Sequence, residues 1–522
     1  MHITLLGMAI YECLFRLRGV RLAVFGTIVF VVLYGILTNF SISTNRAVVM
    51  MAIMLLARVF GRTYDLITTV SLSALIILLK QPMQIYQSGF LLSFGAVVGV
   101  GVVYPYMEEM CTERTGKFMK SVLFFLAIQL VTLPILLNTY FQVPTYSILL
   151  NLLVLPFMSL VVICGLLGGV IGCVSLNLGG MVMAGAIYIL KGVRVLCELI
   201  YRLPEFYIVT GKPSRPVCLC YILLVVVGLL FLSRKKKLGF GWLAAAMIIM
   251  LLPTPNPRLT ITMLDVGQGD GLFVESPSGN TYLIDGGSSD VKEVGRYRIL
   301  PFVKARGYGK IDFILMSHGD SDHTSGIIEL LEATKSSEIS IGCLVLPYTS
   351  YEDEAYDSIR NLAKECGVEV RYLEAGDSFE DGELLFTCLH PSYEYQAASE
   401  NDYSMTLKLS YHDFTMLFTG DMEGGAEEAV MAEYQLEDVD VLKVAHHGSK
   451  YSTSREWLEH VTPAVALISA GKSNRYGHPH EELLERLEEK SITILKTMES
   501  GAVTIETDGG EVKISEFLSG KD

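Results

Sequence analysis

Charged residues are scarce in this sequence. Of its 522 residues only 18% are Asp, Glu, Lys or Arg, whereas 51% are hydrophobic and the mean hydropathy is +0.43. Soluble globular proteins carry about a quarter charged residues. The shortage excludes a protein that is soluble over its whole length, and the chain is also longer than the roughly 100 to 200 residues of one ordinary domain.

A cysteine framework is also missing. The ten cysteines follow no regular spacing, and seven of them lie in or beside apolar segments. Cysteine in such places is usually a small buried hydrophobic residue. The pattern argues against both a disulfide scaffold and a cysteine-ligated metal site.

Basic residues are scarce in the second half. Residues 1–255 contain 19 Lys and Arg against 7 Asp and Glu, a net charge of +12, whereas the remainder contains 22 against 48, a net charge of −26. The change falls at LLPTPNPRLT, where three prolines in five positions stiffen the chain. We predict a membrane domain over 1–253 and a second domain over 254–522.

Ten apolar segments in the first half are candidate membrane helices, although several are shorter than the roughly 20 residues that cross a bilayer. They cover 4–15, 19–40, 46–60, 64–79, 88–105, 120–138, 146–173, 177–201, 216–232 and 238–252. The eighth carries Lys191, Arg194 and Glu198, which indicates either a polar pathway or an amphipathic surface helix.

Basic residues concentrate in the first, third, fifth and ninth connections between these segments. They are Arg16, Arg18, Arg21, Arg58, Arg62, Arg114, Lys117, Lys120 and the run 234–237. Because Lys and Arg accumulate on the cytoplasmic side, we expect the odd-numbered connections to be cytoplasmic. An even number of crossings then places both chain ends, and the acidic second half, outside.

From Thr260 onward the pattern changes to short β-type runs separated by glycine and acidic turns, with helices between them. Five predicted strand ends carry chemically active side chains: Asp285, residues 318–323, His390, Asp421, and His446 with His447. Such strand ends meet at one rim of a sheet, where binding sites form.

The strongest local signal is SHGDSDHTSG, residues 317–326. So many charged and titratable groups side by side are costly without a cation. We predict that four of them are metal ligands arranged around two ions, with Asp322 also counted as catalytic: His318, Asp320, Asp322 and His323. Asp421 is expected to bridge the two ions, and His446 to cap one.

The second half resembles the metallo-β-lactamase fold, whose motif is His-x-His-x-Asp-His followed by later Asp and His ligands, over nearly all of 258–515. In order, LDVGQGDG, YLIDGG, SHGDSDHTSG, LFTGD, VLKVAHHGS and YGHP resemble the C-terminal domain of the ComEC family of DNA-uptake proteins. MHITLLGMAIY, NRAVVMMAIMLLARVFGR and QSGFLLSFGAV resemble its competence domain. The resemblance implies a polytopic α-helical membrane domain followed by an αββα metallo-β-lactamase-like domain.

The resemblance also implies a function. The family is implicated in moving one DNA strand across the cytoplasmic membrane during natural transformation, and the C-terminal domain is proposed to degrade the other strand outside. The expected partners are DNA, the lipid bilayer, other uptake proteins and further copies of the chain. Because Met1 falls inside the family's pattern, we expect the family's N-terminal part to be missing.

Further residues are candidates for catalysis and support. His447 is expected to contact substrate, because neighbouring residues on a strand point opposite ways and His446 is assigned to the metal. His478 is expected to protonate the leaving oxygen or contact phosphate, and Lys443 to hold phosphate. Asp285 is expected to orient a ligand histidine.

The third histidine that the fold normally provides before the bridging aspartate has no matching position. His390 and the NDYS run lie in that stretch, and Asn401 or Ser404 is expected to line the site. In the GQGD loop, Gln268 and Asp270 are interpreted first as loop structure and second as the floor of the site.

Asp320 stands where the fold has histidine. A carboxylate oxygen is a harder ligand than an imidazole nitrogen. This favours two Mn²⁺ or Mg²⁺ ions over Zn²⁺ and suits a phosphodiesterase. Two alternatives are a membrane-anchored hydrolase of another phosphoester and a transporter with a catalytically inactive binding domain.

The net charge of −26 opposes DNA binding, which normally draws on Lys and Arg. Either a local groove is basic, or the membrane domain and partner proteins recruit the strand. The candidates for such a groove are Lys443, Lys450, Arg455, Lys472 and Arg475.

Overall fold

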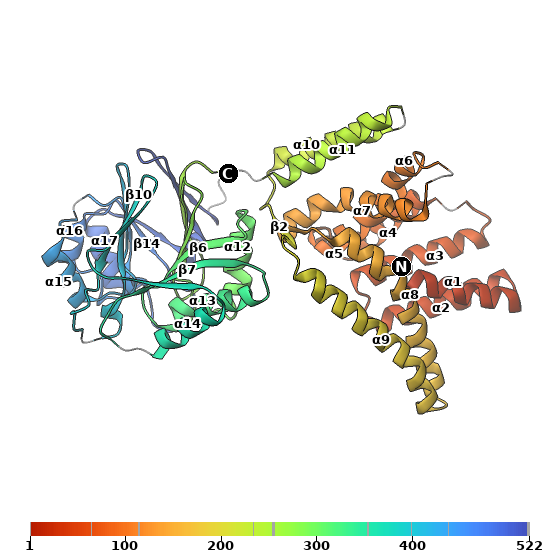
Figure 1. Cartoon of the computed structure of the whole chain (residues 1–522), viewed down its shortest axis with the longest axis horizontal. Coiled ribbons are helices and arrows are strands. Elements are labelled where there is room, and N and C mark those ends of the chain that lie inside the picture. The colour runs from red at the N-terminus through yellow and green to blue at the C-terminus, as the bar shows by residue number, and fades with distance from the viewer. Residues whose placement is uncertain are drawn as a thin grey trace. The chain divides into compact units, whose positions relative to one another are not determined.

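The chain divides into a helical unit up to residue 253 and a sheet-containing unit from residue 254 (Figure 1). This computed structural model describes residues 2–63, 65–112, 115–232, 234–252, 256–351, 354–397, 399–436 and 438–518. The predicted domain boundary and Arg114 of the fifth connection lie outside the described residues.

Helices form over all ten apolar segments of the first unit. They are α1 (His2–Arg18), α2 (Val20–Leu37), α3 (Ile42–Val59), α4 (Leu66–Lys80), α5 (Ser88–Val98) continuing through η2 (Gly99–Val103) into α6 (Tyr104–Glu108), α7 (Lys117–Tyr140), α8 (Ser147–Gly172), α9 (Leu176–Tyr201), α10 (Arg215–Leu232) and α11 (Lys236–Leu251). A short turn, η1 (Pro82–Tyr86), precedes α5, and β1 (Gln142–Pro144) pairs with β2 (Tyr207–Val209).

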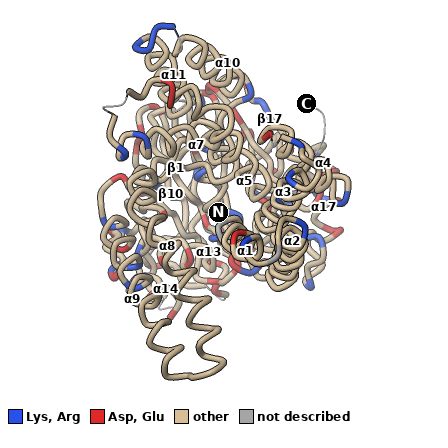
Figure 2. The backbone as a smooth tube through the Cα atoms, turned by 90° about the vertical axis from the view of Figure 1, so that its right-hand side faces the viewer, with Lys and Arg blue, Asp and Glu red and all other residues tan. Residues whose placement is uncertain are grey.

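Among the described residues, seven helical segments are long and apolar enough to cross a bilayer: α2, α3, the continuous Ser88–Glu108 helix, and α7 to α10. Helix α8 is the clearest case, because Leu167 and Val170 are 52% and 69% exposed on a helix of mean hydropathy 2.5. Such a surface suits lipid and not water. The helices are tan along most of their length in Figure 2, with blue at the α10–α11 connection. The chain is therefore a membrane protein.

The charged side chains of α9 pair with each other. Arg194 Nε lies 2.7 Å from Glu198 Oε1, and the two side chains are 81% and 52% exposed. The pair lies on a face of α9 that is not covered by other described helices.

The second unit is a sandwich of two sheets. One sheet has the order β17-β16-β3-β4-β5-β6-β7-β8 and the other the order β15-β14-β13-β12-β11-β10-β9. The strands of the first are β3 (Leu259–Met263), β4 (Leu272–Glu275), β5 (Thr281–Ile284), β6 (Lys310–Leu315), β7 (Ser340–Pro347), β8 (Glu369–Leu373), β16 (Val503–Thr507) and β17 (Val512–Glu516). Those of the second are β9 (Ser378–Asp381), β10 (Leu384–His390), β11 (Thr406–Tyr411), β12 (Phe414–Phe418), β13 (Val441–Lys443), β14 (Val465–Ile468) and β15 (Thr493–Lys496).

Helices cover both outer faces of the sandwich (Figure 1). On the eight-stranded sheet lie α12 (Leu300–Ala305), α13 (Ser321–Lys335) and α14 (Glu354–Glu365), and on the other lie α15 (Gly424–Glu433), α16 (Arg455–Val461) and α17 (Glu481–Glu489). One apolar layer fills the space between the sheets, and one fills the space under each set of helices. This αββα arrangement confirms the fold class predicted from the sequence.

The parallel parts of the two sheets place the chemically active loops together. Strands β5, β6 and β7 run parallel, as do β12 to β15. Because the carboxyl ends of parallel strands meet at one edge, the loops that follow β5, β6, β12 and β13 converge there.

Two glycines allow the start of α13 to approach the neighbouring loops. A Cβ atom on Gly287 would overlap the backbone of Asp322 and His323, and one on Gly269 would overlap the carbonyl oxygen of Gly287. Gly269 also has a φ of 155°, which favours glycine. The metal-ligand candidates of α13 therefore depend on this close backbone contact.

We predict that Gly287→Ala lowers the free energy of unfolding of the second unit by about 1 to 3 kcal/mol, because the backbone atoms it meets cannot rotate away. The chain has two tryptophans, and Trp457 is buried in the second unit. Denaturant unfolding of the Trp242→Phe chain, followed by Trp457 fluorescence, measures this change. Gly424→Ala is the control, because its Cβ would meet nothing within 4 Å; equal effects of the two substitutions would contradict the prediction.

Candidate metal centre

His323 lies at the centre of the cluster and comes from the first turn of α13. It is fully buried, and its Nδ1 donates to Asp285 Oδ2 at 2.9 Å, which turns its Nε2 toward Asp421. Asp285 follows β5 with a left-handed φ of 56°, and its other oxygen accepts a hydrogen bond from the Ser317 backbone at 2.7 Å. Asp285 thus holds both the ring of His323 and the loop that carries His318.

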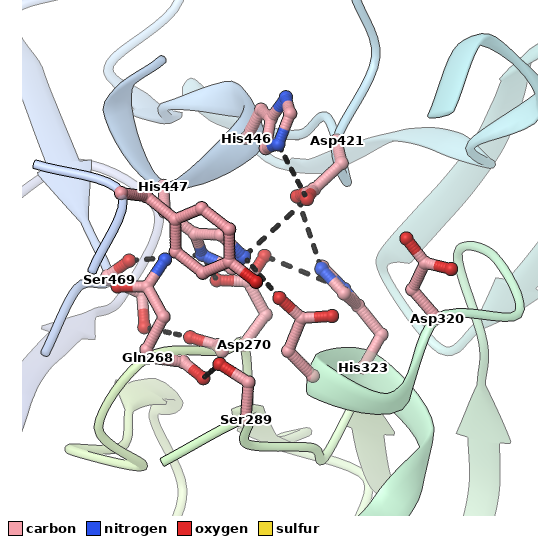
Figure 3. Close-up of polar contacts among 12 residues, drawn as sticks. Gln268, Asp270, Ser289, Asp320, His323, Asp421, His446, His447 and Ser469 are labelled. Carbon is pink, nitrogen blue, oxygen red and sulfur yellow. Dashed lines mark hydrogen bonds and ion pairs between the residues drawn. The ribbon is translucent and has the colours of Figure 1, made fainter. Parts of the chain in front are cut away.

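Asp421 lies among three histidines, and its two carboxylate oxygens face different partners (Figure 3). Its Oδ1 is 3.1 Å from His323 Nε2, while its Oδ2 is 3.4 Å from His447 Nε2 and 3.9 Å from His446 Nε2. Its backbone N–H donates to Ser404 Oγ at 3.1 Å. A carboxylate with two occupied faces suits a ligand that is shared between two ions.

The two adjacent histidines do not lie on a strand. Strand β13 ends at Lys443, and Ala445–Gly448 form the short turn η5, in which His446 and His447 both have left-handed φ values of 48° and 52°. The alternation of side chains along a strand, on which their roles were predicted, therefore does not apply.

The structure places His447 inside the cluster and His446 beside it. His447 is buried, its Nε2 lies 3.4 Å from Asp322 Oδ2, and its Nδ1 donates to the carbonyl oxygen of Ser469 at 3.1 Å. His446 has a side chain that is 24% exposed, and its Nδ1 donates to Glu423 at 3.0 Å.

Three of the four residues of the SHGDSDHTSG loop join two groups of ligand atoms that lie within 4.8 Å of one another. One group contains His318, His323 and Asp421, and the other contains Asp322, His323 and His447. Asp320 lies at the edge, with its side chain 52% exposed and its Oδ2 3.6 Å from His318 Nε2. Figure 3 shows it to one side of the Asp421–His323 contact.

Several buried atoms in and beside these groups face opposite charges in ion pairs but make no hydrogen bond of regular geometry among the described residues. They are the Nε2 atoms of His318, His323 and His447, Oδ1 of Asp421, and both side-chain oxygens of Asp270. Buried polar atoms are nearly always hydrogen-bonded, so a set held only by such ion pairs suits a cation as a further partner. Imidazole and carboxylate groups at this spacing fit divalent cations. The residues present therefore fit the metal ions that the fold implies.

Asp270 belongs to the cluster, although sequence reasoning placed it first in loop structure. It is fully buried, its Oδ2 forms an ion pair with Lys443 Nζ, and its Oδ1 is 3.5 Å from His447 Nδ1. Lys443 is 1% exposed and also donates to the Gly420 carbonyl oxygen at 2.8 Å. The ammonium group is thus held inside the domain, which corrects the phosphate contact predicted for it. The charged residue in GQGD, directly before the buried strand β4, is the signal that could have identified Asp270.

Opposite charges control the protonation of the buried groups. Burial opposes the charged forms, but the carboxylates of Asp421 and Asp285 raise the pKa of His323 well above its usual value. Burial also lowers the pKa of His447, but the charges of Asp421 and Asp270 outweigh it and raise that pKa to about 10. His323 and His447 in turn hold the pKa of Asp421 well below its usual range, although burial acts to raise it.

The remaining predicted residues occupy different places. Ser404 touches the cluster through the backbone of Asp421, whereas Asn401 lies in the turn before Ser404 and, among the described residues, its side chain makes no hydrogen bond to the cluster. His390 is separate, because its Nε2 donates to the carbonyl oxygen of Asp402 at 2.7 Å and burial lowers its pKa to about 4.

His478 lies beside the two histidines of η5. Its ring centroid is 5.4 Å from that of His446 and 6.4 Å from that of His447. Burial and the charges of these two residues lower the pKa of His478 to about 4. It is therefore a neutral hydrogen-bonding group at neutral pH and does not carry the charge of a protonated acid.

Family models match both units. The Competence protein model covers residues 1–235, and the Beta-lactamase superfamily domain model covers residues 280–468. The chain is 28% identical to ComE operon protein 3 of Bacillus subtilis (strain 168) over 524 residues, which cover 96% of this chain and 66% of that protein. It is 29% identical to Competence protein ComA of Neisseria gonorrhoeae over 492 residues, 92% of this chain and 64% of that one.

Among solved structures, the metallo-β-lactamase fold protein YhfI from Bacillus subtilis covers 49% of this chain and 100% of its own, with 13% identity and a TM-score of 0.33. The two matched domains and the metal-type cluster define a membrane protein with a C-terminal metallo-β-lactamase-fold domain. Over both of its units the chain is similar to the ComEC family of competence proteins. It spans less than two thirds of the length of these curated relatives.

We predict that metal binding to this centre releases protons. Because the raised pKa of His447, about 10, and that of His323 keep both rings protonated near pH 7.5, a metal ion must displace those protons. The affinity for Mn²⁺ should rise between pH 6 and 9 by about tenfold per pH unit for each proton displaced. Calorimetric titration in buffers of different ionisation enthalpy counts the protons.

His412 supplies a matched control, because it lies on the β11–β12 turn and pairs with Glu383 at 3.1 Å. His412→Gln should leave the proton count unchanged, whereas His447→Gln should lower it by about one. Binding that neither releases protons nor depends on pH would refute the prediction.

Proposed function

We propose that the second unit is a divalent-metal-dependent phosphodiesterase that cleaves DNA, and that the protein takes part in DNA uptake across the cytoplasmic membrane. In this proposal one strand is transported and the other is degraded. The observation that carries the hydrolase is the convergence of buried histidine and carboxylate atoms on Asp421. Similarity to the competence proteins supports DNA as the substrate.

The geometry supports two ion positions that share Asp421. We assign one to His318, His323 and Asp421, and the other to Asp322 and His447 with the second oxygen of Asp421. This exchanges the roles predicted for His446 and His447. Asp320 and His446 flank the two positions, and the number of carboxylates favours Mn²⁺ or Mg²⁺ over Zn²⁺.

When bound, the ions supply Lewis-acid chemistry that activates water and neutralises charge on a phosphate. Other residues of the chain hold these ligand side chains in position. Asp285 orients His323, while Lys443 fixes the carbonyl group of Gly420 and thereby the start of Asp421. His478 lies beside His446 and His447 and is neutral at neutral pH, so it offers a ring N–H to a phosphate oxygen.

We predict that the purified chain in detergent cleaves labelled DNA with Mn²⁺ or Mg²⁺ and loses this activity in EDTA. Asp421→Asn and His447→Gln should each lower cleavage by about a hundredfold or more, because each removes a donor from the centre. His412→Gln should cleave at the normal rate. A folded, metal-loaded chain that cleaves bis(p-nitrophenyl) phosphate but no DNA would favour a hydrolase of another phosphoester, and one that cleaves neither would favour a binding domain.

We also propose that the second unit lies outside the cytoplasmic membrane. The positive charge of the odd-numbered connections supports this placement. It requires that the shorter helices α1, α4 and α11, of 17, 15 and 16 residues, cross as well as the seven longer ones. At about 1.5 Å per residue these helices span roughly 22 to 26 Å, so local thinning of the bilayer or flanking residues must accommodate them.

Fusions of alkaline phosphatase, which is active only outside the cytoplasm, test the placement. A fusion after residue 522 should be active, and one in the α3–α4 connection after residue 62 should be inactive. A green fluorescent protein at the same two positions should give the opposite pattern. Phosphatase activity only at residue 62 would reverse the proposed orientation.

A further inference from the structure

A fixed loop between β14 and α17 places His478 next to His446 and His447 of the metal centre. Asn474 holds it together: its Nδ2 donates to the carbonyl oxygens of Gly471 and His478 at 2.8 and 2.6 Å, and its Oδ1 accepts from the His478 backbone at 2.9 Å. The backbone N–H of Tyr476 also donates to Asn474 Oδ1, at 3.2 Å. The position of Tyr476 relative to His478 is therefore set by the loop itself.

A row of aromatic rings connects the buried centre with the surface at this loop. The ring centroids of His323 and His447 are 5.3 Å apart, and those of His447 and His478 are 6.4 Å apart. Tyr476 stacks on His478 with a centroid distance of 5.6 Å and an angle of 23° between the rings. Tyr476 ends the row at the surface, where it is 44% exposed.

A second exposed tyrosine lies on the loop that follows the metal-centre histidines. Tyr451 is 69% exposed. This loop is joined to the first one, because the Lys450 backbone N–H donates to His480 Nδ1 at 3.1 Å and the His480 backbone N–H donates to the Gly448 carbonyl oxygen at 2.9 Å. The two loops thus form one surface next to His447 and His478.

Each of these tyrosines is accompanied by a cation. The guanidinium carbon of Arg475 lies 4.9 Å from the ring centroid of Tyr476, and Lys450 Nζ lies 5.4 Å from that of Tyr451. Arg475 Nη2 also donates to Tyr476 Oη at 2.7 Å, and this hydrogen bond raises the pKa of the guanidinium group.

Two of the other three cations of the predicted basic groove form ion pairs within the domain, and Lys450 itself lies 3.9 Å from Glu482 Oε1 in a partly exposed pair. Lys443 is buried against Asp270, and Arg455 forms an ion pair with Glu489. A duplex, which is bound through many phosphate contacts, finds little positive charge on a unit of net charge −26. Unpaired bases are different, because they also bind by stacking on aromatic rings.

We propose that Tyr476 with Arg475, and Tyr451 with Lys450, form a platform on which unpaired bases stack, so that the centre acts on single-stranded DNA. This inference rests on the proposed DNA-cleaving function. The rings would hold the bases that flank the phosphate at the metal centre, and the two cations would contact neighbouring phosphates. Bases in a duplex are stacked on each other and reach the platform only after unpairing.

The test uses the full chain in detergent with EDTA, so that DNA is bound and not cut. The probes are a fluorescein-labelled 20-nucleotide oligothymidylate, an abasic strand of the same length, and a 20-base-pair duplex. The double variant Tyr451→Leu with Tyr476→Leu should bind the oligothymidylate roughly 25-fold more weakly or worse. The loss of one stacked base lowers the affinity by about fivefold to a hundredfold, and two are lost here. Binding of the abasic strand and of the duplex should not change.

The matched variant Tyr451→Phe with Tyr476→Phe keeps both rings and should bind like the unchanged protein. In the presence of Mn²⁺, the leucine variant should raise KM for the oligothymidylate with little change in kcat. Trp457 fluorescence in the Trp242→Phe background shows whether the variant is folded. If it is not, Lys450→Gln with Arg475→Gln replaces it, with a smaller loss of binding expected for both single strands and none for the duplex.

Equal binding of the oligothymidylate by the leucine and phenylalanine variants would overturn the proposal, and so would an equal loss for the abasic strand or the duplex. The binding measurements do not depend on cleavage. A chain that binds through the tyrosines without cutting would therefore contradict only the proposed nuclease, and a chain that cuts without using the tyrosines would contradict only the platform.

Discussion

The second unit is organised around buried charges that reach from one sheet to the other. Asp270 and His323 belong to the eight-stranded side, whereas Lys443, Asp421 and His447 belong to the seven-stranded side, and the ion pairs join them across the sandwich. Removing one member of a buried pair typically costs about 3 to 5 kcal/mol, because the other charge remains buried without a partner. The same contacts therefore hold the sheets in register and bring the candidate metal ligands together.

Much of this arrangement could be predicted from the sequence, because the signals were local. Apolar runs predicted the ten helical segments, short β-type runs with glycine turns predicted strands alternating with helices in the second unit, and the family resemblance implied their αββα arrangement. The SHGDSDHTSG loop identified His318, Asp322 and His323 because the donors are close in sequence. Asp421 was predicted because it is a carboxylate at a predicted strand end, and the structure places it beside His323 and His447.

The rest required tertiary structure. His446 and His447 were assigned from strand alternation, but the chain leaves the strand at Lys443 and enters a left-handed turn that no periodicity indicates. Lys443 resembles a surface lysine in the sequence, and only the packing of two sheets shows that Asp270 neutralises it. Likewise, the net charge of the unit says nothing about Arg475 and Tyr476, whose proximity to the centre comes from the loop held by Asn474.

The wide sequence separation of the ligands has a consequence for the time at which the centre forms. Its donors extend from Asp270 to His447, and the loops that carry them belong to different sheets. Contacts of such high sequence separation form late in folding, because long loops must close first. A chain still being synthesised, or one whose second sheet has not closed on the first, holds no complete ligand set. Formation of the ligand cluster is thus coupled to completion of the domain, so under the proposed function a partly folded chain would not cleave DNA during its own production.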